Sequence, residues 1–342
     1  MRASLLHWYD RSARPLPWRR EPRDPYLTWV VETMSQQTRI ETVVARLPGF
    51  LARFPDVGRL AAADPGEVLA AWSGLGYYRR ARALHAAARV IAHDLDGRWP
   101  SDVAGWLRLP GVGPYTAAAV AAQALGIATI AVDGNVRRVG ARLLGLREPT
   151  DADVRRGLAE LLLVPGAGSS ATPVAGAAHD PARVAEALVE LGAVVCTPRR
   201  PRCDDCPLRS GCAAAAAGDP TRFPAPRRRP RVQPLTLHAW WVTRAGEDGR
   251  DRMALERRPE DGLWGGLHGP PWRTEAPAVG TRVASFRHLL THRRIEAIVW
   301  RTPTPPADAE VAWYRRDEAL ALGLARIDRR ALACLDGHGA LG

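Results

Sequence analysis

Four of the five cysteines of this 342-residue chain lie in one short stretch, at Cys196, Cys203, Cys206 and Cys212, in the pattern C-x6-C-x2-C-x5-C. A disulfide framework is disfavoured, because the charged N-terminus lacks the apolar segment of a secretory signal. Zinc sites usually have two x2 pairs or a mixture of cysteine and histidine, and only one x2 pair is present. Four thiolates in one loop favour a [4Fe–4S] cluster, with zinc as the alternative.

The charge of the chain suits a polyanionic partner. The net charge is +12 and all 48 basic residues are arginine, because the sequence contains no lysine. Neutralised phosphates release counterions, which favours nucleic-acid binding. The alternative is that a GC-rich genome raises the arginine content without any such partner. No apolar run is long enough to cross a bilayer. We expect a cytoplasmic, nucleoid-associated monomer without membrane contact.

The pattern of apolar residues changes along the chain. From about Tyr26 to Leu146, alanine-rich helical periodicity is broken by short glycine and proline turns. Another helix is predicted at 181–195. Residues 164–180 are rich in glycine, alanine, serine and proline and predict a surface insertion. Residues 213–233 have the proline and arginine content of a linker.

Beyond the linker, short strands are predicted at 235–243, 253–257, 282–286 and 295–300. The fold class that follows is a mainly α domain at 1–212, joined by the linker to a smaller α+β domain at 234–342.

A glycine-rich turn, Leu109-Pro110-Gly111-Val112-Gly113-Pro114-Tyr115-Thr116, precedes an alanine-rich helix. A Gly-x-Gly turn that enters a helix points free backbone N–H groups outward, and the helix dipole adds positive character. Such a turn holds a phosphate. An ordinary corner between two helices is the alternative, since the spacing alone is common.

Two acids lie in apolar surroundings. Glu32 stands in VVETMSQQT and Asp133 in IAVDGNVRRV. A buried acid can serve as a proton donor, because burial raises its pKa. For Asp133 a helix N-cap or an ion pair is the alternative interpretation.

Several of these motifs together resemble the helix-hairpin-helix glycosylases. LPGVGPYTA is similar to their DNA-gripping hairpin, and the cysteine spacing to the [4Fe–4S] loop of endonuclease III and the MutY adenine glycosylases. VETMSQQT and VDGNVRRV are similar to the MutY motifs S-E-x-M-L-Q-Q-T and D-G-N-V-x-R-V. GLWGGL at 262–267 resembles a turn of the Nudix-like domain of MutY.

The resemblance implies a domain organisation. A six-helix part would span about 26–135, and an iron–sulfur part about 1–25 and 136–212. A Nudix-like domain that reads 8-oxoguanine would follow at 234–342. No R-E-x-x-E-E helix follows Leu267, so Nudix hydrolase activity is not expected.

The resemblance also implies catalytic roles. Glu32 would protonate adenine at N7 and later handle the water. Asp133 would stabilise the cationic sugar, either electrostatically or through a transient covalent adduct. Asn135 would orient Asp133, and Tyr115 would line the pocket. Lyase relatives have a lysine where this chain has Tyr115, and a chain without lysine cannot form a Schiff base through a lysine side chain. A monofunctional glycosylase is therefore predicted.

The remaining implied contacts fall into four groups. Trp18 would stack on the flipped adenine, and Arg19 and Glu186 would contact its edge. Residues that fill the vacated base stack would be Gln37, Leu75 and Tyr77. For Trp18 and Tyr77, ordinary core packing is the alternative. Phosphate contacts would come from Gly111, Gly113 and Thr116. Lesion contacts would come from Thr291 and His292, within the segment 286–292 that matches an F-S-H loop.

Some positions depart from the family pattern. Val31 and Ser35 replace the commoner serine and leucine beside Glu32, and Leu290 replaces an aromatic wedge. The leading hypothesis is excision of adenine opposite 8-oxoguanine or guanine in double-stranded DNA. A thymine glycosylase for T·G mismatches is one alternative, although that class typically lacks a lesion-reading domain. A DNA-binding homologue without catalysis is the other.

Overall fold

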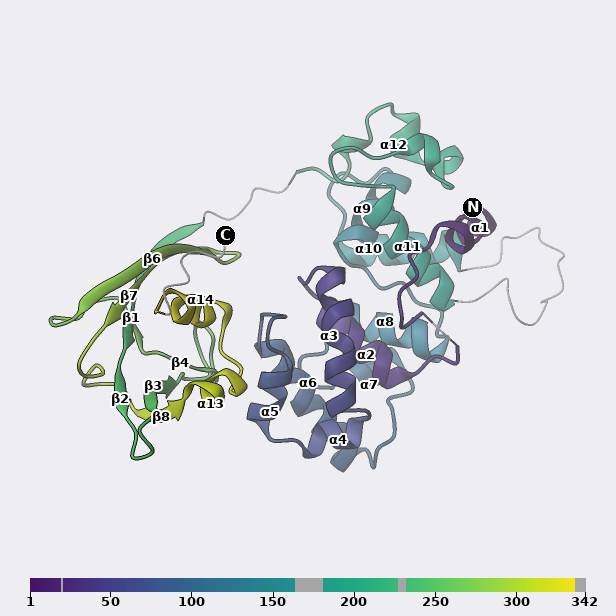
Figure 1. The fold of residues 1–342 in the computed structure, drawn as a ribbon. Helices are drawn as coiled ribbons and strands as arrows, with labels where there is room; N and C mark the ends of the chain where they lie inside the picture. Colours follow the sequence, from purple (N-terminus) through teal and green to yellow (C-terminus); the bar gives the residue numbers. More distant parts are fainter. Residues whose placement is uncertain (20, 164–180, 227–231, 336–342) are drawn as a thin grey trace. The chain divides into compact units, whose positions relative to one another are not determined.

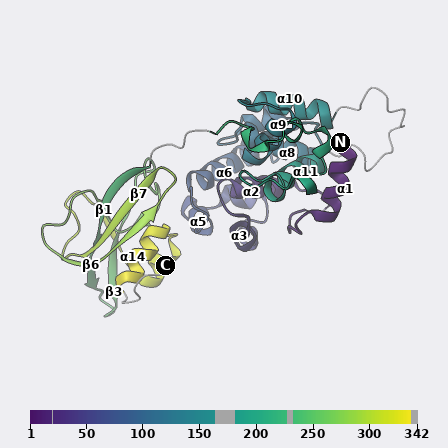
Figure 2. The ribbon, with the colours of Figure 1, turned by 90° about the horizontal axis from the view of Figure 1, so that it is seen from above.

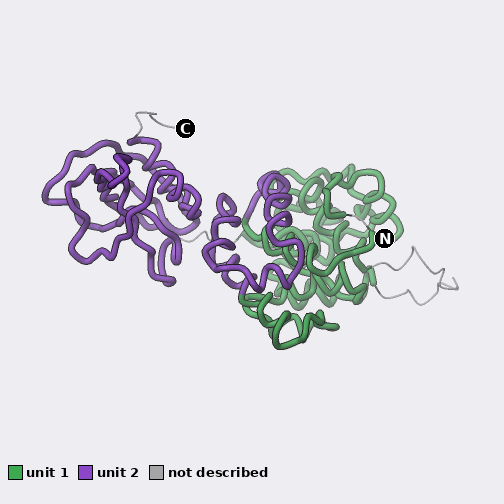
Figure 3. Tube along the Cα trace, turned by 60° about the horizontal axis from the view of Figure 1, so that its bottom comes forward, with its two compact units in different colours: residues 1–37, 86–228 green, residues 38–85, 229–342 purple. Residues whose placement is uncertain are grey.

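The computed structural model describes residues 1–19, 21–163, 181–226 and 232–335. The chain forms two compact units, residues 1–37 with 86–228 and residues 38–85 with 229–342 (Figure 3). The predicted insertion at 164–180 and part of the predicted linker lie outside the described residues. The domain boundaries drawn from the sequence stay predictions.

The first unit is helical (Figure 1). Its helices are α1 (Arg2–Ser12), α2 (Pro25–Ser35), α7 (Val103–Leu107), α8 (Pro114–Leu125), α9 (Gly134–Leu143), α10 (Asp151–Leu162), α11 (Pro181–Val194) and α12 (Ala213–Ala216). Helix α6 (Arg79–Arg89) crosses the boundary between the units in sequence and continues into the π-helical turn η1 (Val90–Asp94). Short 3-10 turns lie at η2 (Cys203–Asp205), η3 (Arg209–Gly211) and η4 (Pro220–Arg222).

Local sequence explains where these helices begin and end. The side chain of Asp24 accepts a hydrogen bond from the first turn of α2, and the side chain of Asp133 does the same for α9. Thr150 begins α10 with a capping box. Pro114 occupies the first position of α8, and Gly126 ends that helix with a left-handed φ of 66°. The predicted helical character of residues 26–146 is confirmed, and no strand occurs among these residues.

The core beneath the cysteine loop comes from α1, α9, α10 and α11. Fully buried residues such as Leu5, Val154, Leu158 and Leu188 form one apolar cluster. Cys196, Cys206 and Cys212 are half-buried and pack against that cluster. The cysteine loop therefore rests on a well-packed helical core. None of the described helices is both long enough and apolar enough to cross a bilayer.

The second unit combines helices with two sheets. Its further helices are α3 (Ile40–Arg53), α4 (Val57–Ala62), α5 (Pro65–Ala71), α13 (Arg316–Ala321) and α14 (Arg326–Leu335). Its strands are β1 (Gln233–Trp241), β2 (Thr243–Ala245), β3 (Asp251–Arg257), β4 (His268–Gly269), β5 (Trp272–Arg273), β6 (Thr281–Leu289), β7 (Arg293–Arg301) and β8 (Val311–Arg315).

One sheet has the order β5-β1-β7-β6, and the other has the order β2-β3-β4 with β8 paired to β3. Strands β1 and β7 run parallel from the pair Gln233–Arg293 to the pair Trp241–Arg301. Alternate residues of β7, namely Ile295, Ala297 and Val299, are fully buried, as a strand with one covered face requires. Helix α14 lies beside β6 (Figure 2). The α+β prediction is confirmed.

A buried ion pair joins α14 to this fold. Asp328 is 0% exposed and accepts hydrogen bonds from Arg258 at 2.8 and 3.1 Å and from the Trp272 indole at 2.8 Å. We expect Asp328→Ala to lower the free energy of unfolding by about 3–5 kcal/mol, because it leaves the Arg258 charge buried without its partner. The measurement is urea unfolding. Arg257→Ala, at a mostly exposed neighbour, is the control and is expected to change it by less than about 1 kcal/mol.

Candidate active site and cysteine loop

Glu32 meets Tyr115 and Gln123 where α2 packs against α8. The Tyr115 hydroxyl donates to Glu32 Oε2 at 2.7 Å, and Gln123 Nε2 donates to Glu32 Oε1 at 2.8 Å. Glu32 keeps a partly accessible surface although the surrounding protein desolvates it. Two of the predicted site residues are thus in direct contact, and Gln123 joins them.

The environment of Glu32 favours its protonated form. Burial is the largest influence and raises the pKa of the carboxyl, and the negative charges of Asp133 and Glu186 raise it further. The hydrogen bonds from Tyr115 and Gln123 oppose this effect without cancelling it. Burial and the charge of Glu32 raise the pKa of Tyr115 well above its usual value, so the phenol remains a donor. A raised pKa is what a general acid requires, because the group must keep its proton until it transfers it.

Both carboxylate oxygens of Asp133 accept hydrogen bonds at the N-terminus of α9. Oδ1 accepts the backbone N–H of Val136 at 2.7 Å, and Oδ2 accepts Asn135 Nδ2 at 3.0 Å. The N-cap interpretation is therefore correct, and it is compatible with a second role because the cap fixes the direction of the carboxylate. Asn135 contacts Asp133 as the sequence predicted.

Arg138 connects Asn135 to the cysteine loop and was missed by the sequence analysis. Its guanidinium donates to Asn135 Oδ1 at 2.9 Å, to the Gly192 carbonyl at 2.6 Å and to the Cys196 carbonyl at 2.7 Å. Gly192 leaves room for this contact, since a Cβ there would lie 2.6 Å from the Cβ of Asn135. The second arginine of the VDGNVRRV motif was the available signal.

The segment between α1 and α2 carries Trp18 and Arg19. Trp18 is half-buried in a turn. Arg19 donates Nη2 to Glu190 Oε2 at 2.8 Å, and Arg14 donates Nε to Glu190 Oε1 at 2.6 Å. Glu190 is 0% exposed. The sequence analysis also missed Glu190, which lies four residues after Glu186 on the same helix. An acid on an apolar helix face was the available signal, because a buried acid needs a cationic partner.

Glu186 is nearly buried and already has partners. The Tyr9 hydroxyl donates to its Oε2 at 2.7 Å, and Arg23 Nη1 donates to its Oε1 at 2.5 Å. Its charge nevertheless acts on Glu32. Glu186 therefore contributes to the electrostatic environment of Glu32.

The predicted phosphate-binding turn has the expected backbone. Gly111 has a φ of 70°, which favours glycine, and Gly113 precedes α8 as an N-cap without a side-chain bond. Thr116 is buried, and its hydroxyl accepts a hydrogen bond from Gln36 at 3.0 Å. The glycines thus shape the turn, whereas the Thr116 side chain faces the protein.

The predicted stack-filling residues differ in exposure. Leu75 is buried, whereas Tyr77 is 46% exposed. Gln37 and Tyr77 have left-handed φ values of 55° and 48°, which are strained for residues other than glycine and occur often at functional sites. Within the second unit the Tyr77 hydroxyl contacts that of Thr291. Both Thr291 and the neighbouring His292 are exposed.

The four clustered cysteines line one cavity, together with Arg142 and Arg209. Arg142 donates to Cys196 Sγ at 3.2 Å. Burial raises the pKa of Cys206 to about 11, with smaller contributions from the other three thiols. Such mutual proximity suits a group that binds all four sulfurs as thiolates. Among the described residues, no set of three His, Cys, Asp or Glu closes around a single ion position.

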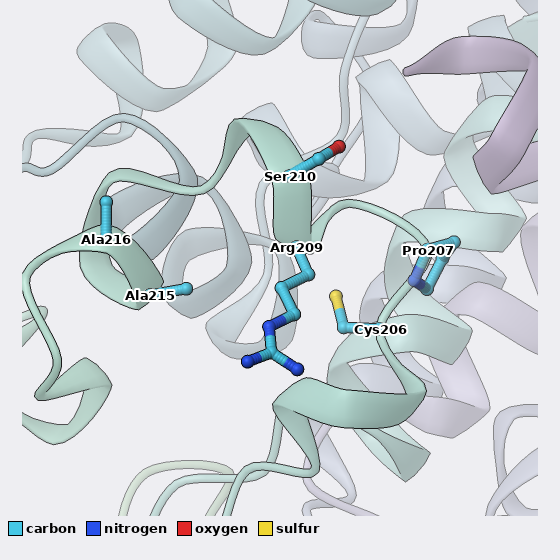
Figure 4. A pocket seen from close by; sticks show the side chains of 6 residues that line it. All are labelled: Cys206, Pro207, Arg209, Ser210, Ala215 and Ala216. Carbon is cyan, nitrogen blue, oxygen red and sulfur yellow. The ribbon is translucent and has the colours of Figure 1, made fainter.

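The wall of a neighbouring cavity is shown in Figure 4, where the Cys206 sulfur and the Arg209 guanidinium face the same space. Cys334 is separate from this group. It lies half-buried on α14 in the second unit.

Three parts of the chain match known protein families. Residues 30–163 match the HhH-GPD superfamily of base excision DNA repair proteins, and residues 239–334 match the NUDIX domain. Residues 196–212 match the iron–sulfur binding domain of endonuclease III. The last match decides between the two metal interpretations, and the cofactor is a [4Fe–4S] cluster.

Named relatives cover most of the chain. The adenine DNA glycosylase of Mycolicibacterium smegmatis is 43% identical over 67% of this chain and 73% of its own length. That of Rattus norvegicus is 37% identical over 89% of this chain and 65% of its own length. The Homo sapiens enzyme is 41% identical. That match covers 62% of this chain and 39% of the human protein. The chain belongs to the adenine DNA glycosylase family.

Solved structures support the fold of the helical part. A thermostable thymine-DNA glycosylase matches with a TM-score of 0.53 and 26% identity, over 63% of this chain and 94% of its own. A trapped endonuclease III–DNA covalent intermediate matches with a TM-score of 0.52 and 21% identity, over the same shares. The helix-hairpin-helix fold predicted from the sequence is confirmed.

We expect Cys206→Ser to reduce the iron bound per chain and the visible absorbance of the cluster, because serine is a poor ligand for this group. Iron analysis and an absorbance spectrum of the purified protein measure both. Cys334→Ser is the matched control and should leave both values unchanged. Equal iron content in the two variants would contradict the assignment of Cys206 as a ligand.

Proposed function

We propose that the chain is a monofunctional DNA glycosylase that hydrolyses the N-glycosidic bond of adenine mispaired with 8-oxoguanine or guanine. The observation that carries this proposal is the pair of acids in the first unit. Glu32 has a raised pKa and a partly accessible surface, while Asp133 is fixed as an acceptor by Val136 and Asn135. Two carboxyls in such different environments suit an acid and a stabilising anion.

Glu32 donates its proton to N7 of adenine as the bond between C1′ and N9 breaks, and the bonding electron pair leaves with the base. Asp133 stabilises the positive charge that develops on the sugar. Water adds its oxygen to C1′, and its proton passes to the Glu32 carboxylate. The products are free adenine and an abasic sugar, and the enzyme returns to its starting state. Tyr115 and Asn135 orient the two acids.

Further residues hold the DNA. Trp18 stacks on the extruded base, Arg19 and Glu186 contact its edge, and Gln37, Leu75 and Tyr77 fill the gap in the stack. Gly111, Gly113 and Thr116 support a backbone phosphate, with contacts from the hairpin rather than from the Thr116 hydroxyl. Thr291 and His292 of the Nudix-like domain read the opposite lesion. The protein acts as a monomer on nucleoid DNA.

Cys196, Cys203, Cys206 and Cys212 hold the [4Fe–4S] cluster. When bound, the cluster supplies a structural centre that organises a basic loop, to which Arg199, Arg200, Arg202 and Arg209 contribute charge.

Thymine excision from T·G mismatches is the second candidate, because a thymine-DNA glycosylase is among the structural matches. That match covers 63% of the chain. The NUDIX-family segment at 239–334 favours the adenine activity, since a lesion reader has a use opposite 8-oxoguanine.

Single-turnover cleavage of four duplexes tests this proposal. They contain A opposite 8-oxoguanine, A opposite G, A opposite C and T opposite G. We expect the fastest excision from the first, with strand breaks only after alkali, because the chain has no lysine for a lyase step. Preference for T opposite G would establish the second candidate. Inactivity on all four would leave only a DNA-binding role.

A further inference from the structure

Glu186 is held from two sides by groups that belong to no motif of the sequence. Tyr9 on α1 donates to Oε2 at 2.7 Å. Arg23, just before α2, donates to Oε1 at 2.5 Å and to Oε2 at 3.2 Å. The side chain of Glu186 is 5% exposed. Its carboxylate is therefore fixed in place by three hydrogen bonds, two of which come from a cation.

The direction of these bonds is unambiguous. An arginine guanidinium has only donors. Burial, followed by the charge of Glu186, raises the pKa of Tyr9, so the phenol keeps its proton at neutral pH and donates it to the carboxylate. Glu186 consequently acts only as an acceptor in this network.

Counting acceptor positions shows what Glu186 can still bind. A carboxylate offers about four lone-pair sites, two on each oxygen. Tyr9 and Arg23 occupy both sites of Oε2, and Arg23 occupies one site of Oε1. Within the described part of the chain, one site on Oε1 therefore stays open for a donor. Because the charge of Glu186 acts on Glu32, that site is within electrostatic range of the proposed general acid.

We propose that Tyr9 and Arg23 are positioning residues that determine base specificity by holding Glu186 as a fixed acceptor for the exocyclic amine at purine C6. A 6-aminopurine donates an N–H to the open site on Oε1. A 6-oxopurine presents a carbonyl oxygen to a carboxylate and is rejected, and an unsubstituted purine makes no bond there. This inference rests on the proposed function and names the feature by which it selects adenine.

The test compares bases in otherwise identical duplexes opposite 8-oxoguanine. Single-turnover excision of adenine and of unsubstituted purine is measured for the wild type, Tyr9→Phe and Arg23→Met. The ratio of the two rates is compared among proteins, since the intrinsic difference between the leaving groups is the same in each. We expect each substitution to reduce the adenine-to-purine ratio about tenfold, as the loss of a charge-assisted hydrogen bond would. Tyr9→Phe removes a single oxygen, so the fold is preserved.

Asp10→Asn is the matched control. Asp10 pairs with Arg183 and joins the same two helices, α1 and α11, without touching Glu186. The adenine-to-purine ratio of Asp10→Asn should equal that of the wild type. An unchanged ratio in Tyr9→Phe and Arg23→Met would overturn the inference, as would an equal fall in Asp10→Asn, because the effect would then come from helix packing. A wild type that excises no adenine would overturn the proposed function instead.

Discussion

Glu32→Gln is expected to slow adenine excision about 10³-fold while DNA binding is nearly retained. Glutamine has the size of glutamate and can still accept a hydrogen bond from Tyr115, so the contact between α2 and α8 should be kept. It cannot transfer a proton to the departing base. Single-turnover excision and equilibrium binding to the same duplex separate the two effects. Equal losses of rate and binding would show that Glu32 supports DNA binding rather than chemistry.

The pH dependence gives a second measurement of the same role. The reaction needs protonated Glu32, and burial raises the pKa of this group. Activity should therefore persist above the usual titration range of a carboxylic acid and fall as the pH rises through the raised pKa. Because the Tyr115 hydrogen bond lowers the pKa of Glu32, Tyr115→Phe should move this fall to higher pH. Glu32→Gln should lack the transition altogether.

Asp133→Asn is expected to bind the mispaired duplex almost normally and to excise adenine about 10³-fold more slowly. Asparagine caps a helix as well as aspartate does, so the first turn of α9 keeps its hydrogen bond from Val136. What is lost is the negative charge beside the sugar. Alanine would be a poorer test, because it would also remove the cap at a cost of about 1 kcal/mol.

Asp102→Asn supplies a matched control for this substitution. Asp102 caps α7 by accepting a hydrogen bond from the backbone N–H of Gly105, and it is exposed. Its excision rate should equal that of the wild type. Full turnover in Asp133→Asn would refute the assignment of Asp133.

The sequence predicted those strands of the second unit in which apolar and polar residues alternate over a long enough stretch. The alternating strand patterns predicted β1, β3, β6 and β7, because one covered face imposes a period of two residues. The short strands β2, β4, β5 and β8 were not predicted, since two to five residues carry too little pattern. Helix α14 was not predicted either. Its buried face includes Asp328, and an acid indicates a solvent-exposed position unless its partner, here Arg258, is known.

In the candidate site, too, residues within local motifs could be predicted, whereas their partners from distant parts of the chain could not. Glu32, Tyr115, Asp133 and Asn135 stand in recognisable motifs, and the structure brings Glu32 to Tyr115 and Asn135 to Asp133. Their supporting groups depend on distant parts of the chain. Tyr9 and Glu186 are separated by 177 residues in sequence, and no local pattern pairs them.

Helix α9 joins two places that are usually considered separately. Asp133 precedes its first turn, and Arg138 on the same helix donates a hydrogen bond to the carbonyl of Cys196 at the start of the metal-binding loop. Helix α9 therefore connects Asp133, the proposed stabilising anion, to the cysteine loop. We expect a chain short of iron to become a slow enzyme before it becomes an unfolded one. Excision rates per folded chain at graded iron content would show this, and rates independent of iron would contradict it.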